Sequence, residues 1–160
     1  MTRPLPPFAI MLGIAGLLPF IVCSLGALSL SSDGSTRSLL ALVAYGATIL
    51  AFLGGVHWGF ALEGSNNPSQ RIQRARFGLG VVPSLIGWAA LLVTFIGLPT
   101  TGLLVLTAGF VATTVVEAQA ARRNLMPRRY MWLRWGLSIV VVVCLVSVSL
   151  IRAFGGRVVL

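Results

Sequence analysis

Five long apolar stretches, separated by short polar connections, take up most of this chain of 160 residues. They run about Phe8 to Leu30, Leu39 to Leu62, Phe77 to Gly97, Leu98 to Glu117 and Met131 to Ile151. At ~1.5 Å of helical rise per residue, each stretch is long enough to cross a hydrocarbon core of ~30 Å. We therefore expect an all-α integral membrane protein in which residues 1–160 form one domain, a bundle of five transmembrane helices.

Two other architectures are excluded by composition and pattern. The chain is 57% apolar and only 9% charged, which leaves too little polar surface to cover a soluble fold. In lipid, only helices or a closed barrel satisfy every backbone hydrogen bond. The uninterrupted apolar run from Ile139 to Leu145 is incompatible with the alternating pattern of barrel strands.

The basic residues predict an orientation, because all twelve are arginines and most lie in the connections. The amino terminus and the second-to-third and fourth-to-fifth connections share one side, which holds Arg3, Arg71, Arg74, Arg76, Arg122, Arg123, Arg128, Arg129 and Arg134. The other side holds Arg37, Arg152 and Arg157. By the positive-inside rule, the amino terminus is cytoplasmic and the carboxyl terminus external.

The first apolar stretch also has features of an export signal, since Arg3 precedes it. It is much longer than the ~7–15 residues of a signal core. We expect it to remain as an uncleaved first helix.

The second stretch contains Gly54, Gly55 and Gly59, which we expect to be helix-packing positions. Gly55 and Gly59 form a small-xxx-small pair of the kind that lets helices approach closely in membranes. His57 shares a face with Gly54, and we expect that face to turn toward protein rather than lipid.

Prolines inside the first and third stretches, Pro19 and Pro83, each remove a backbone donor and are expected to bend their helices. A bend at Pro83 suggests a cavity lined by Trp58, Pro83 and Trp88. The alternatives are a structural bend without a ligand, an interfacial belt position for Trp58 and core packing for Trp88.

Four ionisable residues are expected at similar depth near the cytoplasmic side: His57, Glu117, Arg134 and Arg76. An ionisable group within the membrane is costly, so we predict a candidate polar site at these residues. The alternative is structural: His57 bonds a carbonyl of a neighbouring helix, and Glu117 and Arg134 form an interfacial pair. A single histidine with no carboxylate at ligand spacing predicts no metal, and no cofactor motif is present.

A basic cluster brackets Pro127 in the fourth connection and consists of Arg122, Arg123, Arg128 and Arg129. Each is expected to attract anionic lipid headgroups with about 1 kcal/mol. Because the membrane explains this charge, we expect no nucleic-acid partner.

The run Gly-Gly-Val-His-Trp-Gly at positions 54–59 is preceded by Tyr45-Gly46-Ala47 and Phe52-Leu53. This region, Tyr45 to Gly59, resembles an uncharacterised family of small bacterial membrane proteins that includes the mitochondrial transmembrane protein 69. The resemblance implies an inner-membrane location, which for a bacterial protein is the plasma membrane, and it carries no established activity.

Three functions are compatible with these features. We favour a non-enzymatic structural, assembly or accessory subunit that packs against other membrane subunits or against itself, because no nucleophile elbow, phosphate loop or metalloprotease motif occurs. The alternatives are a binding or sensing protein for a hydrophobic ligand in a bundle cavity, and a small proton-coupled carrier that uses His57 and Glu117.

Overall fold

The computed structural model describes residues 7–29, 32–62, 70–122 and 128–155, and all of these segments are helical or in short helix-connecting turns. The helices are α1 (Pro7–Ala15), α2 (Leu18–Ser29), α3 (Ser32–Leu62), α4 (Gln70–Phe95), α5 (Pro99–Arg122) and α6 (Arg128–Gly155). They supply five segments long and apolar enough to cross a membrane, namely Pro7–Ser29, Asp33–Gly59, Phe77–Phe95, Pro99–Arg122 and Met131–Phe154. The predicted all-α fold is confirmed, with five helical segments that are long and apolar enough to cross a membrane.

The first span is divided into α1 and α2 by a break at Gly16 and Leu17. Pro19 lies in the first turn of α2, where a missing N–H is tolerated, so this proline accompanies a break and not a smooth bend. The Tyr45 hydroxyl of α3 donates a hydrogen bond of 3.0 Å to the Gly16 carbonyl, which satisfies one of the backbone groups in the break.

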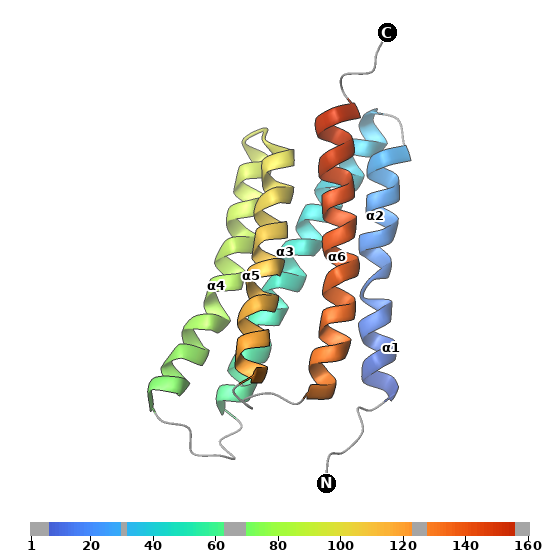
Figure 1. The fold of residues 1–160 in the computed structure, drawn as a ribbon. Helices are drawn as coiled ribbons and strands as arrows, with labels where there is room; N and C mark the ends of the chain where they lie inside the picture. The colour runs from blue at the N-terminus through green and yellow to red at the C-terminus, as the bar shows by residue number, and fades with distance from the viewer. Residues whose placement is uncertain (1–6, 30–31, 63–69, 123–127, 156–160) are drawn as a thin grey trace.

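The connection between α4 and α5 is a tight Schellman turn. Gly97 has a φ of 91°, and the N–H groups of Gly97 and Leu98 donate to the carbonyls of Thr94 and Val93, each at 3.1 Å. Pro99 then opens α5 at a position where proline is favoured. Such a short link makes α4 and α5 antiparallel neighbours, as Figure 1 shows.

The helix arrangement places α3 at the centre of the bundle. It packs against α2, α4 and α5, while α6 packs against α5, α2 and α1 (Figure 1). At one end of the bundle, Arg152 of α6 donates to the Ser35 hydroxyl of α3, which in turn donates to the Ala27 carbonyl of α2. These bonds join the three helices at the end opposite Arg122.

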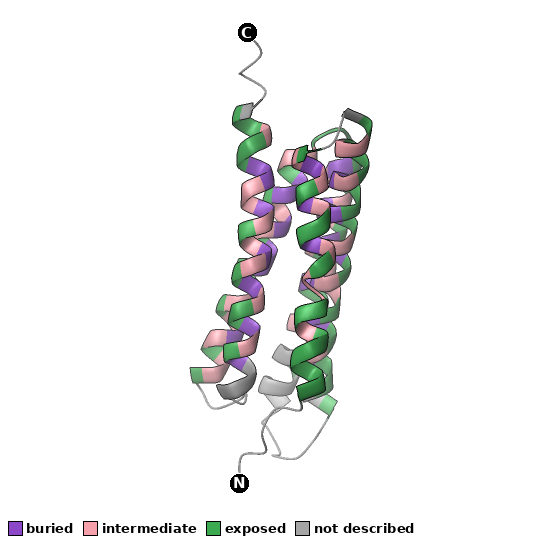
Figure 2. Cartoon of the chain, turned by 90° about the vertical axis from the view of Figure 1, so that its right-hand side faces the viewer, coloured by how far each residue is buried: buried purple, intermediate pink, exposed green. Residues whose placement is uncertain are grey.

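The apolar core lies between α2, α3, α5 and α6. Phe20 is at its centre, with ring edges against Tyr45 at 5.0 Å and Phe110 at 6.0 Å between centroids. The outer faces carry exposed aliphatic side chains such as Val22 and Leu85, whereas buried residues face inward (Figure 2). This apolar exterior suits a lipid environment and would not suit water.

Candidate functional site

The site is centred on an ion pair between α5 and α6. Arg134 Nε lies 2.9 Å from Glu117 Oε2, and the two side chains are 6% and 0% exposed. Both residues belong to membrane-spanning segments. The structure therefore places two opposite charges inside the bundle, where each neutralises the other.

Two hydroxyls extend this pair along the α5–α6 interface. Arg134 Nη1 donates to the Ser138 hydroxyl, one turn further along α6. The Ser138 and Thr114 hydroxyls are hydrogen-bonded with 3.2 Å between their oxygens, and Thr114 also donates to the Phe110 carbonyl at 2.8 Å. The result is a polar cluster of Glu117, Arg134, Ser138 and Thr114 that joins the two helices.

His57 is on α3, which packs against α5, and it is 4% exposed. Its Nδ1 is 3.1 Å from the Leu53 carbonyl oxygen one turn earlier, so Nδ1 carries the proton in the neutral ring and Nε2 is an acceptor. The partner shown is thus a carbonyl of its own helix, not of a neighbouring one. His57 borders a small cavity together with Thr113 of α5, the helix that carries Glu117.

The cluster leaves buried polar atoms unsatisfied. Among the described residues, Glu117 Oε1 and Arg134 Nη2 are buried and have no hydrogen-bond partner. Such groups cost free energy in an apolar interior unless water or another ligand satisfies them. A small cavity of about 60 Å³ borders His57, Pro83 and Thr113 between α3, α4 and α5, and it is large enough for a water molecule.

Of the three residues expected to line a cavity at the Pro83 bend, Pro83 borders the small cavity, whereas Trp58 and Trp88 are not among its lining residues. Pro83 is buried and lines the small cavity. Trp88 is 60% exposed on the outer face of α4, because five residues along a helix rotate a side chain by about 140° from Pro83. Trp58 is 44% exposed, and its Nε1 donates to the Phe77 carbonyl at 3.1 Å, so it fastens α3 to α4 instead of lining the cavity.

The three glycines expected to be helix-packing positions lie on two different faces of α3. Gly54 makes the close helix contact, because a Cβ atom there would collide with the Gly80 carbonyl of α4. Gly55 and Gly59 are exposed, and nothing lies within 4 Å of a Cβ built on either. Gly55 is rotated by about 100° from Gly54 on the helix, which takes it off the face that α4 covers.

The family is settled by a match along most of the chain. Residues 5–150 match the family model described as "Protein of unknown function (DUF3429)". The chain belongs to this family. It is also similar to Transmembrane protein 69 of Xenopus tropicalis, with 41% identity over 87 residues, which is 54% of this chain and 33% of that protein.

Transmembrane protein 69 of Mus musculus is 33% identical over 87 residues, again 54% of this chain and 34% of the relative. The chain spans about a third of the length of these curated relatives. The resemblance of this DUF3429 member to an uncharacterised membrane family is confirmed. No solved structure matches the chain.

Most of the predicted arginine positions fall outside the described side chains. Arg76 lies in α4, and Arg128 and Arg129 begin α6, but their side chains are not described, and Arg123 lies outside the described residues altogether. Arg122 is exposed in the last turn of α5. Its positive charge suits the carboxyl end of a helix.

Ser138 and Thr114 belong to the cluster but are not among the residues that the sequence predicts for the site. The signal was helical spacing: Ser138 follows Arg134 by four residues, and Glu117 follows Thr114 by three, so each pair shares a helix face. The pairing of those two faces becomes visible only when α5 and α6 are packed together.

Proposed function

We propose that this protein is a non-enzymatic accessory or assembly protein of a bacterial inner membrane, which packs against another membrane subunit or against a second copy. In this proposal the amino terminus is cytoplasmic and the carboxyl terminus external, as the arginine distribution favours. The ion pair of Glu117 and Arg134 has a structural role, because it fastens α5 to α6 inside the bundle.

The observation that carries the proposal is an exposed ridge of small residues on α3. Its members are Ala44, Thr48, Gly55 and Gly59, which lie within about 60° of one another around the helix. The outward face of α4, in contrast, carries bulky side chains such as Leu85 and Trp88. Glycines gain nothing from contact with lipid, whereas small residues let another helix approach closely.

The proposal is tested by mass spectrometry of the protein released gently from its native membrane. We expect the wild type to retain a protein partner or a second copy, and the double variant Gly55→Leu/Gly59→Leu to lose it. The control is Gly136→Leu on α6, where the glycine is also exposed and has nothing within 4 Å of a built Cβ. A wild type that carries no protein partner, or a partner retained by the α3 variant, would refute the proposal.

The second candidate is a proton-coupled carrier. It is favoured by one observation: His57, Glu117 and Arg134 are buried on three helices of the bundle, and Glu117 Oε1 and Arg134 Nη2 are unsatisfied. A buried carboxylate beside an imidazole can exchange a proton with a neighbouring water.

Proton flux into liposomes that contain the purified protein tests this candidate. If the protein is a proton-coupled carrier, we expect a pH-dependent proton flux that His57→Ala abolishes. Thr94→Ala, a buried polar change on α4 outside the cluster, is the control and should keep the flux. If the wild type conducts no protons, or His57→Ala conducts them as well as the wild type, the carrier hypothesis is wrong.

A further inference from the structure

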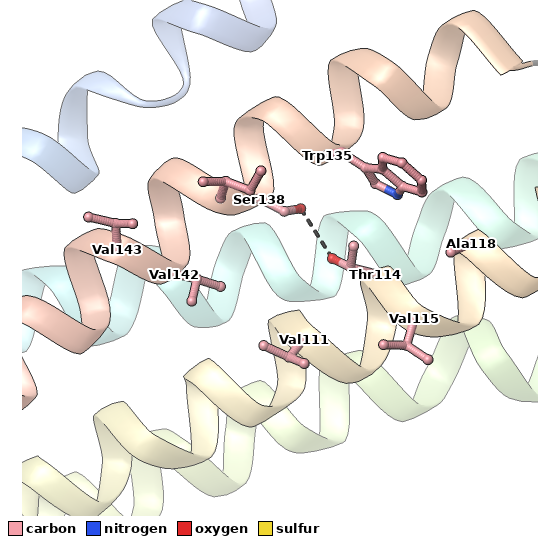
Figure 3. Close-up of a pocket in the computed structure, with 9 residues that line it drawn as sticks. Val111, Thr114, Val115, Ala118, Trp135, Ser138, Val142 and Val143 are labelled. Atoms are coloured by element: carbon pink, nitrogen blue, oxygen red, sulfur yellow. Dashed lines mark hydrogen bonds between the residues drawn. The ribbon is translucent and has the colours of Figure 1, made fainter.

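An apolar groove of about 460 Å³ runs between α5 and α6 on the outside of the bundle (Figure 3). Aliphatic side chains such as Val111, Val115 and Val142 form its walls. Its two hydroxyls, those of Thr114 and Ser138, point toward each other and are hydrogen-bonded (Figure 3). The surface that the groove offers to an occupant is therefore hydrocarbon.

A second hollow of about 240 Å³ continues this groove toward the end of α5. The two hollows share Ala118 and Trp135, so they adjoin. The second one is lined by Arg122 and Trp132 as well. The apolar groove thus continues into a region lined by the indole rings of Trp132 and Trp135 and the guanidinium of Arg122.

The dimensions fit one leaflet of a membrane. From Val111 to Arg122 the groove follows α5 for about 16 Å at the helical rise of ~1.5 Å per residue. Half of a ~30 Å hydrocarbon core is about 15 Å. The described part of this membrane-spanning segment ends at Arg122, and we place the phospholipid headgroups at this end of α5.

The chemistry at the two ends matches the two ends of a phospholipid. Indole rings prefer the headgroup region. Trp132 and Trp135 are exposed at this end of the groove, with ring centroids 5.9 Å apart. A guanidinium binds phosphate through charge-assisted hydrogen bonds. The exposed Arg122 is positioned for such a bond, while the aliphatic walls accommodate an acyl chain.

We propose that the α5–α6 groove binds one anionic phospholipid, with an acyl chain along Val111 to Ala118 and the phosphate at Arg122. This site is specific in place and in headgroup charge, unlike the general layer of lipid around a membrane protein. It does not depend on the accessory role proposed above, because that role concerns the exposed face of a different helix, α3.

The test measures lipid retained by the purified protein in native mass spectrometry after titration with phosphatidylglycerol or with phosphatidylcholine of the same acyl chains. We expect one molecule of phosphatidylglycerol to bind with higher affinity than phosphatidylcholine. Arg122→Gln should weaken phosphatidylglycerol binding about fivefold, which corresponds to about 1 kcal/mol for one arginine near the membrane surface. Arg74→Gln, an exposed arginine near the start of α4, is the charge control and should bind as the wild type does.

A second pair of variants tests the acyl-chain half of the site. Ala118→Phe places a ring where the two hollows join and should reduce binding of both lipids, whereas Leu85→Phe on the exposed face of α4 should not. If Ala118→Phe does not fold, as judged by its helical circular dichroism, Val111→Trp at the exposed far end of the groove replaces it.

Three results would overturn the proposal. Equal retention of the two lipids would show that the headgroup charge is not recognised. An equal loss in Arg74→Gln and Arg122→Gln would show bulk attraction instead of a site. Unchanged binding in the folded groove variants, or a protein in place of the lipid, would show that no acyl chain occupies the groove.

Discussion

Replacing Glu117 by leucine removes the carboxylate from the ion pair and leaves the guanidinium of Arg134 in the bundle. The two side chains are 0% and 6% exposed and 2.9 Å apart, so little solvent is available to compensate the charge that remains. Breaking a buried pair in this way costs about 3–5 kcal/mol of unfolding free energy. We expect Glu117→Leu to fall in that range.

The reverse single change, Arg134→Met, should cost a similar amount because it leaves the carboxylate unpaired and removes the bond to Ser138. The double variant is expected to recover most of the loss, since replacing a whole buried pair by apolar residues of similar volume is often neutral. The coupling energy between the two changes should therefore exceed about 2 kcal/mol, well above the ~0.5 kcal/mol within which independent sites add.

The assay is equilibrium unfolding in mixed micelles, followed by circular dichroism, for the wild type, both single variants and the double variant. Ser149→Ala is the matched control, because Ser149 is also buried on α6 but donates to the Leu145 carbonyl, far from the ion pair. In the double variant Glu117→Leu/Ser149→Ala, the two losses of unfolding free energy should add without a coupling energy. Strict additivity between Glu117→Leu and Arg134→Met would refute the idea that the pair fastens α5 to α6.

Three further predictions concern orientation and packing. Reporter fusions after Asn124 should read cytoplasmic and fusions at Leu160 external, and an external signal at Asn124 would reject the orientation. Gly54→Ala should destabilise the protein by about 1–3 kcal/mol in the same unfolding assay, because its methyl group would collide with the α4 backbone, whereas Gly55→Ala should be neutral or stabilising. Trp58→Phe should cost about 1 kcal/mol by removing its hydrogen bond to α4, and an unchanged unfolding midpoint would count against that contact.

The five spans were predictable because the transfer of some twenty apolar residues into lipid outweighs every other local preference. The turn at Gly97 and Pro99 was also predictable from the sequence, since glycine is common at helix ends and proline at helix starts. The inward placement of His57, Glu117 and Arg134 followed from the cost of an ionisable group in lipid.

The packing faces were harder to predict, because lipid and protein interior are both apolar. In a soluble helix the exposed side is polar and marks the buried side by contrast. Here Trp88 is as well accommodated by lipid as by a core, and its sequence position gave no sign of its outward direction. Gly54 and Gly55 differ only by a rotation of about 100°, which the sequence does not distinguish without the path of α4.

The ion pair also bears on how the last two helices enter the membrane. A charged side chain at the centre of an isolated helix costs about 2.5–3.5 kcal/mol on insertion. Alone, α5 would carry the Glu117 carboxylate and α6 the Arg134 guanidinium, and each would meet part of that cost. Because the two helices are consecutive in the chain and their charges meet at 2.9 Å, the hairpin presents lipid with a neutral pair. Insertion of α5 and α6 together is therefore favoured over insertion of either helix by itself, and the contact that stabilises the folded bundle also lowers the cost of forming it.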